Sequence, residues 1–187
     1  MSRLKADGWP EGDSFARFAT IRETTCNGEP FGIALFSRRQ LDTAQKYDLP
    51  EDQRGGVHKL LCAPLAARPH LRFCTTHITG SEAVIGGSNI KEQQLAAVRG
   101  HLQELHNNGD TVLIAGDFNA RPDDVRLNSW YSSSLNVPNN SGNTGAYREL
   151  DDQDPVCVGI GETTVNEVNG DGEPIETKPP PATSAPR

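Results

Sequence analysis

Residues 111–119 read Thr-Val-Leu-Ile-Ala-Gly-Asp-Phe-Asn, a run of apolar or small residues that stops on Asp117, Phe118 and Asn119. The length and composition of this run indicate a buried strand. Such a strand delivers a carboxylate and a carboxamide at its carboxyl end, which is where open α/β sheets place their ligands. Asp117 and Asn119 are therefore the first candidate site residues.

The pattern just before this strand predicts a helix. Apolar side chains recur at helical spacing over residues 89–105, and Asn89 can cap the helix together with Glu92. The Asn-Asn-Gly sequence at 107–109 is typical of a helix end.

A strand over residues 71–78 precedes that helix, so the segment reads as strand, helix, strand. A crossover of this kind makes the two strands parallel and is nearly always right-handed. Both strands then end at the same edge of the sheet, where His77 and Asp117 emerge together. If the strands are neighbours, their backbones lie within roughly 5 to 10 Å of each other.

Two further strands are expected at 31–36 and 57–64, and the second forms a hairpin or short meander with 71–78. A polar loop over 42–56 lies between them and contains Pro50 and a Gly-Gly pair. A loop of this length in a compact domain often covers or borders a site.

The four cysteines show no close-paired metal spacing, which argues against a zinc site. Cys62 and Cys74 fall in two strands that we expect to be neighbours. We interpret them as buried reduced cysteines, which behave as small apolar residues. The alternative is a disulfide framework, which would require an oxidising compartment and whose connectivity, with Cys26 and Cys157 included, cannot be read from sequence.

Composition narrows the class of protein. A chain of 187 residues can form one domain with a substantial core. The net charge of -7 argues against a broad cationic patch for nucleic acid. No apolar stretch approaches the roughly 20 residues of a membrane span, so we predict no membrane span. Residues 1–7 also lack the apolar core of a signal peptide.

The motifs around the candidate residues resemble those of one known family. They are Thr76-His77, Lys91-x-x-Gln94 and Gly116-Asp117-Phe118-Asn119-Ala120-x-Pro122. This set resembles the second half of the endonuclease/exonuclease/phosphatase superfamily, which has the DNase I-like fold. Residues 31–38 resemble an earlier strand of that family, and the resemblance covers residues 31–130.

The resemblance implies an α/β (α+β) fold, a partial DNase I-like four-layer sandwich of two packed mixed sheets with outer helices. We expect this truncated domain over residues 1–165. The Pro-rich composition of residues 166–187 cannot bury apolar area, so we expect a disordered tail there.

The family also implies roles for three residues. Asp117 resembles the carboxylate that orients or deprotonates the attacking water, and Asn119 the amide that steadies the scissile phosphate or a metal-bound water. His77 resembles the histidine that donates to phosphate oxygens. The implied cofactor is Mg²⁺ or Mn²⁺, for which Asp117 and Asn119 would serve only as second-site or water-mediated ligands.

Other polar residues near these motifs are expected to have surface roles. His58 and Lys59 fit an exposed strand face better than a phosphate-facing base. The remaining candidates are predicted to be helix-face or solvated residues: Gln94, His101, His106, Arg121 and Arg126.

The chain departs from the family pattern at both ends. Full-length members carry a Gln-Glu pair whose glutamate binds the metal. The Gln-Glu pair in this chain is Gln103-Glu104, which lies inside the predicted helix. Glu23 is available but lacks the sequence context of the family pair. Members also end with a Ser-Asp-His box, whereas the last histidine here is His106. Metal binding is expected to be weak if that glutamate is absent. An internal start at Met1, a shifted carboxyl terminus and a shortened relative without catalysis are all open explanations.

The predicted function is a metal-dependent phosphodiester or phosphate-ester hydrolase. Among these activities a nuclease is expected first, and inactivity of this fragment is an open alternative. The alternatives are a phospholipid or inositol phosphate phosphatase, a catalytically dead binding module that keeps the fold, and a secreted effector with disulfides. The expected partner is a phosphodiester substrate such as nucleic acid, and no protein partner is predicted. The location would be cytoplasmic if Met1 is the true start and secreted if the amino terminus is truncated.

Overall fold

The computed structural model describes residues 8–10, 12–121, 124–136 and 141–148. The chain divides into two compact units, residues 1–119 and 120–187, and each is described by itself. Among the described residues, no helix is long and apolar enough to cross a membrane.

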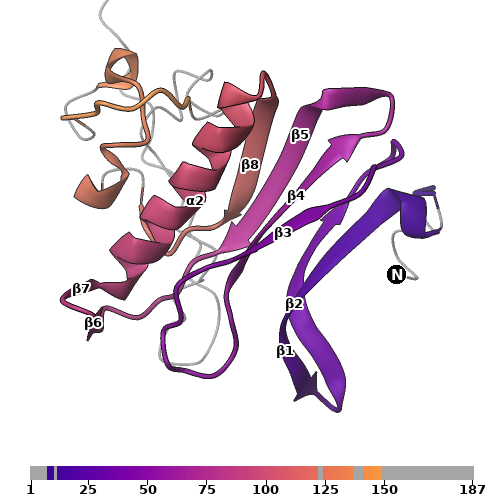
Figure 1. Cartoon of the computed structure of the whole chain (residues 1–187), viewed down its shortest axis with the longest axis horizontal. Coiled ribbons are helices and arrows are strands. Elements are labelled where there is room, and N and C mark those ends of the chain that lie inside the picture. Colours follow the sequence, from indigo (N-terminus) through magenta and orange to yellow (C-terminus); the bar gives the residue numbers. More distant parts are fainter. Residues whose placement is uncertain (1–7, 11, 122–123, 137–140, 149–187) are drawn as a thin grey trace, which may run out of the picture. The chain divides into compact units, whose positions relative to one another are not determined.

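The first unit is built on a four-stranded sheet with the strand order β3–β4–β5–β8 (Figure 1). Its strands are β3 (Gln45–Asp48), β4 (Lys59–Leu65), β5 (Arg68–His77) and β8 (Thr111–Asp117). The first three strands pair antiparallel, and β5 pairs with β8 in parallel. The predicted hairpin and the predicted parallel crossover are both confirmed. The prediction that 111–117 is a buried strand was wrong in part, because β8 is an edge strand of this sheet and only Val112 in it is buried.

Strand β3 lies inside the segment predicted as a loop over 42–56, so that prediction was wrong in part. Gln45–Asp48 is mostly exposed and polar, and only Tyr47 is half-buried. The strand forms because β4 offers it a free edge, with Tyr47 opposite Leu60. An edge strand with one half-buried side chain carries too weak a hydrophobic pattern to be recognised in sequence.

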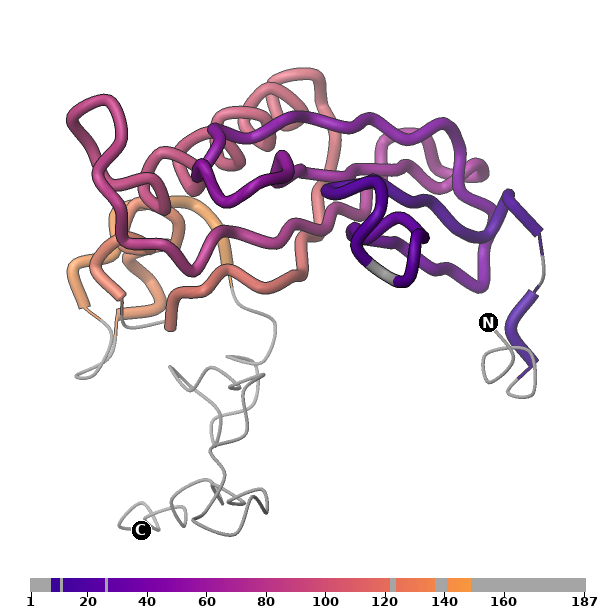
Figure 2. The backbone as a smooth tube through the Cα atoms, turned by 90° about the horizontal axis from the view of Figure 1, so that it is seen from below, coloured from indigo at the N-terminus to yellow at the C-terminus, as the bar shows by residue number. Residues whose placement is uncertain are grey.

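The predicted helix is α2 (Ile90–Asn107), and the side chain of Asn89 caps it by accepting hydrogen bonds from the main-chain N–H groups of Lys91 and Glu92. The helix ends at Asn107, Asn108 is its C-cap, and Gly109 follows with a φ of +83°. Figure 2 shows α2 as a layer of its own over the sheet. The helix buries an apolar stripe made of Ile90, Leu95, Val98, Leu102 and Leu105.

The two faces of the sheet are covered differently. Tyr47 of β3 stacks on His101 of α2, with ring centroids 4.2 Å apart, so α2 covers the face that Tyr47 points to. Leu61 and Ala63 point to the opposite face because successive side chains alternate along a strand, and both are fully buried.

A hairpin of β1 (Ala16–Cys26) and β2 (Glu29–Phe36) contacts β4 and β5. It covers the face of the sheet opposite α2, which explains the burial of Leu61 and Ala63. Strand β2 was predicted, but β1 was not. The inner side of β1 carries buried Ala19 and Ile21, whereas its end is polar and exposed. Shorter elements complete the unit: η1 (Asp13–Phe15), β6 (Val84–Ile85) and β7 (Ser88–Asn89).

The predicted α/β class is confirmed. A mixed sheet, an outer helix and a second, antiparallel pair of strands are present in the described part of residues 1–119. The predicted boundary at residue 165 and the predicted tail at 166–187 lie outside the described residues and stay predictions.

The second unit is described over residues 120–121, 124–136 and 141–148. It contains two short 3₁₀ turns, η2 (Val125–Leu127) and η3 (Ser133–Leu135). The Trp130 ring packs on the Tyr147 ring with their centroids 5.6 Å apart. Within the unit, the buried apolar side chains are Leu127, Trp130 and Leu135.

The interpretation of Cys62 and Cys74 as reduced residues is wrong in this structure, where they form a disulfide. They are directly opposite each other in the β4–β5 ladder, and their Cα atoms are 4.1 Å apart. Cross-strand partners at such a separation are within the reach of one S–S bond. The side chain of Cys26 and all of Cys157 lie outside the described residues.

Candidate active site

His77 and Asp117 meet at the carboxyl ends of β5 and β8, as predicted. The two residues are register partners in the parallel ladder. The His77 Nε2 atom lies 3.6 Å from the Asp117 Oδ2 atom, and the two side chains are 36% and 42% exposed. An imidazole and a carboxylate are thus adjacent at a sheet edge and open to a ligand.

The close approach of the two strands depends on Gly116. A Cβ atom at this position would collide with the Thr76 carbonyl oxygen on β5. Beyond the ladder, the main-chain N–H of Ile78 donates to the Asp117 carbonyl oxygen over 2.8 Å. The glycine therefore sets the spacing from which His77 and Asp117 project.

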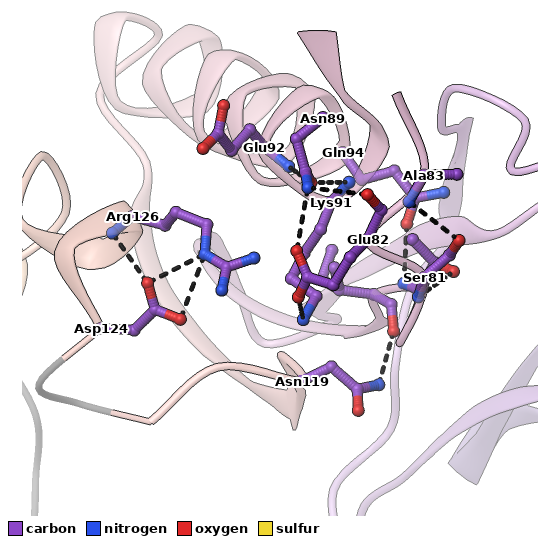
Figure 3. A network of polar contacts seen from close by, with 12 residues as sticks. Ser81, Glu82, Ala83, Asn89, Lys91, Glu92, Gln94, Asn119, Asp124 and Arg126 are labelled. Atoms are coloured by element: carbon purple, nitrogen blue, oxygen red, sulfur yellow. Dashed lines mark hydrogen bonds and ion pairs between the residues drawn. The ribbon is translucent and has the colours of Figure 1, made fainter. Parts of the chain in front are cut away.

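Asn119 is held beside the same strand ends. It has a φ of +46°, a left-handed conformation that asparagine tolerates better than most residues. Its main-chain N–H donates to Asp117 Oδ1 over 2.9 Å. Its side-chain Nδ2 donates to the Ile78 carbonyl oxygen over 2.7 Å (Figure 3). The structure therefore places all three predicted site residues, His77, Asp117 and Asn119, within one cluster.

His58 was predicted to lie on an exposed strand face, and that prediction was wrong. Its side chain is 14% exposed, and its Nδ1 atom lies 2.6 Å from the His77 carbonyl oxygen. The other ring nitrogen, Nε2, lies 3.4 Å from Asp52 Oδ2. The residue turns inward because these two acceptors lie within reach of its two ring nitrogens.

Asp52 is a site-bordering residue that the sequence analysis did not identify. It is 5% exposed, and it accepts hydrogen bonds from the Thr79 hydroxyl over 2.6 Å and from the Arg54 main-chain N–H over 3.0 Å. Burial alone would raise the pKa of Asp52, but these hydrogen bonds and the charge of His58 outweigh burial and lower the pKa below its usual value. The loop that carries Asp52 is therefore tied to the end of β5, as the prediction of a site-bordering loop implied.

Gln94 was predicted to be a helix-face residue, but it is fully buried. Its Oε1 atom accepts from the Thr79 main-chain N–H over 2.8 Å, and its Nε2 atom donates to the Pro50 carbonyl oxygen over 2.7 Å. The sequence held a signal for this burial, since Gln94 lies midway between Ile90 and Val98 on the apolar stripe of α2. Its amide therefore joins the two loops that flank the site.

We expect Gln94→Leu to lower the free energy of unfolding by about 2 kcal/mol, because the buried Thr79 N–H and the half-buried Pro50 carbonyl each lose their partner. Urea unfolding of the full chain measures this change. The matched control is Gln103→Leu, on the exposed side of the same helix. Equal stability of the two variants would contradict the bridging role of Gln94.

A second polar cluster lies at the far end of the sheet. Asp110 is 6% exposed and accepts hydrogen bonds from Arg72 and from His70, the latter over 3.1 Å. Burial would raise the pKa of Asp110, but the bonds and charges of Arg72 and His70 outweigh it and lower the pKa. This carboxylate therefore stabilises the folded chain in its ionised form.

The lowered pKa values of Asp52 and Asp110 predict a loss of stability in acid. A carboxyl group with a depressed folded-state pKa contributes stability above its unfolded pKa, and this is lost as the pH falls below about 4. We expect the free energy of unfolding to change little from pH 7 to 5 and to fall between pH 4 and 3. Urea unfolding at each pH tests this, and Asp110→Asn should show a shallower fall. A wild-type fall no steeper than that of the variant would contradict it.

The remaining candidates divide by exposure. Lys59 is 19% exposed and pairs with Asp48, so it is not on an exposed face. His101 and His106 are half-buried rather than surface residues. Arg121 is exposed as predicted, whereas Arg126 is 22% exposed and its Nε donates to Asp124 Oδ1 over 2.9 Å.

The model of the Endonuclease/Exonuclease/phosphatase family matches residues 4–182. The chain belongs to this family. Family membership agrees with the DNase I-like resemblance of the motifs and with the α/β architecture.

Solved structures of modest similarity also match. The human Nocturnin catalytic domain with bound sulfate anion is 18% identical, with a TM-score of 0.49, and the match covers 72% of this chain and 52% of that one. A truncated Caenorhabditis elegans TDP2 is 12% identical, with a TM-score of 0.43 and coverage of 66% and 45%. The chain thus spans about half the length of these structures. No curated protein matches.

The family is typically metal-dependent, so we tested whether the site suits Mg²⁺. That ion favours octahedral oxygen ligands, with one or two carboxylates and substrate phosphates. Asp117 and Asn119 can supply oxygen atoms, but Asp117 Oδ1 already accepts the Asn119 N–H and Oδ2 faces His77. In the described part of the chain, no three His, Cys, Asp or Glu side chains gather as a metal group. These residues do not form a metal site by themselves, and we derive no catalytic step through a metal.

Proposed function

We propose that this chain contributes the hydrolytic residues of a phosphodiester hydrolase. The observation that carries the proposal is the adjacency of His77 Nε2 and Asp117 Oδ2, 3.6 Å apart at the open ends of two parallel strands. Membership of the Endonuclease/Exonuclease/phosphatase family supports it. Because the chain spans about half of the matched structures, the activity of the whole protein is part of the proposal.

In this proposal, the oxygen of a water molecule forms a bond to phosphorus while the opposite bond, from phosphorus to the leaving oxygen, breaks, and the leaving oxygen takes up a proton from solvent. Asp117 accepts the proton of the water as it attacks, a role that requires a carboxylate within hydrogen-bond reach. His77 donates to a non-bridging phosphate oxygen, where negative charge accumulates in the transition state. Asn119 is an exposed residue fixed by its bonds to Ile78 and Asp117, and it orients the phosphate through the side-chain amide hydrogen that is not bonded to Ile78.

We propose a nucleic acid as the first substrate to test, as the motif resemblance suggests. The experiment incubates the full chain and Mg²⁺ with plasmid DNA, a chromogenic phosphodiester, a chromogenic phosphomonoester and a phosphoinositide. Cleavage of the first two supports a nuclease. Release of phosphate from either of the last two would replace the nuclease with a phosphatase. No turnover of any substrate would contradict hydrolysis by this chain.

A catalytically inactive binding module is the second candidate. It is favoured by the finding that Asp117 and Asn119 form no metal group with other described acidic residues. Retention of DNA or of a phosphoinositide without turnover would support this candidate over the hydrolase.

We propose that the protein acts in an oxidising compartment. The Cys62–Cys74 disulfide supports this, since such bonds are rare in reducing compartments. Mass spectrometry of the protein purified from its native source, after alkylation without reductant, tests it. Peptides joined through Cys62 and Cys74 support the proposal, and alkylation of both cysteines would overturn it.

A further inference from the structure

His58 contacts the main chain of a candidate site residue, His77, and a buried carboxylate, Asp52. Its Nδ1 atom lies 2.6 Å from the His77 carbonyl oxygen, and its Nε2 atom lies 3.4 Å from Asp52 Oδ2. A carbonyl oxygen only accepts hydrogen bonds, so Nδ1 carries the proton in this contact. The opposite nitrogen faces a carboxylate, which also only accepts when ionised. His58 is therefore placed between two fixed acceptors.

His58 contacts the main chain of His77 on the side of β5 that faces away from β8. On the β8 side, the next peptide is held by the bond from Ile78 N–H to the Asp117 carbonyl oxygen. The backbone that carries the His77 side chain is thus fixed on both sides. The rings of His58 and His77 also meet edge to face, with centroids 5.6 Å apart and planes at 89°. Such packing restricts rotation of the His77 ring.

Asp52 is itself immobilised by contacts that lead back to α2. The Thr79 hydroxyl donates to the same Oδ2 atom that faces His58, and the Thr79 main-chain N–H donates to Gln94. Asp52, Thr79 and Gln94 are all buried. Hydrogen bonds and the Asp52–His58 ion pair therefore link the helix to the main chain that carries the His77 side chain.

We propose that His58, held by Asp52, is a positioning residue that fixes His77 with its Nε2 atom toward Asp117. It acts through His77 and does not touch the substrate. The kinetic consequence rests on the proposed hydrolase function, whereas the orientation of the His77 ring can be measured without turnover.

Two substitutions separate the two contacts of His58. Asparagine places its amide N–H near the position of the imidazole Nδ1, so His58→Asn can keep the bond to the His77 carbonyl oxygen. Glutamine places its amide nearer to the position of Nε2, so His58→Gln keeps the Asp52 contact and loses the other. The control is His70→Gln, at the far end of β5, where the side chain is 75% exposed and also pairs with an aspartate.

The experiment records the ring-proton resonances of His77 and the amide resonance of Ile78 in the full chain, together with kcat and KM for a chromogenic phosphodiester. We expect His58→Gln to move these resonances and to lower kcat about tenfold, because a misplaced catalytic group loses orientation, with KM little changed. His58→Asn should keep the resonances and kcat near their wild-type values, and His70→Gln should leave both unchanged.

Unmoved His77 resonances in His58→Gln would overturn the proposal. The proposal would also be overturned if His58→Asn and His58→Gln lost kcat equally and both had a lower melting temperature. In that case His58 would only stabilise the fold. A wild-type chain without turnover would count against the proposed function alone. In that case the resonances still decide whether His58 positions His77.

Discussion

Asp117→Asn is expected to lower kcat for phosphodiester hydrolysis by about 100-fold or more, because it removes the general base. The variant keeps an oxygen that can accept the Asn119 main-chain N–H, which Asp117 Oδ1 accepts in the wild type. Asp117 is also 42% exposed, so the melting temperature should change little. Initial rates on a chromogenic phosphodiester at equal protein concentration measure the effect.

The matched control for this substitution is Asp42→Asn. Asp42 is exposed and also accepts a main-chain N–H through its side chain, from Thr43, but it lies by the far end of β4, where its own N–H donates to Pro64. Its rate should equal that of the wild type. A wild-type rate retained by Asp117→Asn would remove Asp117 from the proposed chemistry.

Loss of the Cys62–Cys74 disulfide is expected to lower the free energy of unfolding by about 3 kcal/mol. The reason is that the bond reduces the conformational entropy of the unfolded chain by closing a loop of this size. The two cysteines are separated by 12 positions. For a chain of this length the melting temperature should fall by roughly 6 to 12 °C. Thermal unfolding of the oxidised chain and of the chain refolded in reductant gives the difference.

The double variant Cys62→Ala/Cys74→Ala controls for the other two cysteines. It should melt near the reduced wild type, and reductant should not lower its melting temperature further. A wild-type melting temperature that reductant does not change would contradict a stabilising disulfide.

The segment from β5 through α2 to β8 could be predicted because local signals agree with each other. The cap at Asn89, the apolar stripe of the helix and the apolar run of β8 each identify one element. The parallel crossover then brings His77 and Asp117 to one edge without any knowledge of side-chain contacts. This is why the central pair of the site follows from sequence.

The surroundings of the pair could not be predicted in the same way. Asp52 and Thr79 are 27 positions apart, and His58 and His77 are 19 apart. These contacts depend on how an irregular loop folds, which no periodic pattern encodes. Strand β3 was missed for a related reason, since its pairing with β4 rather than its own composition makes it a strand.

Gln94 and the cysteines show a different limit. The position of Gln94 on the buried stripe was readable, but its polarity suggested an exposed face, and only its two loop partners explain its burial. The pairing of Cys62 with Cys74 required the register of β4 against β5, which a prediction of two neighbouring strands does not supply.

The central claim is that His77 and Asp117 act on the same phosphodiester as one unit. A double-mutant cycle tests it most directly, with His77→Asn, Asp117→Asn and the double variant assayed on a chromogenic phosphodiester. Residues that act as a unit show strongly non-additive effects. We predict that the double variant is about as slow as the slower single variant. Losses that multiply, or four equal background rates, would contradict the claim.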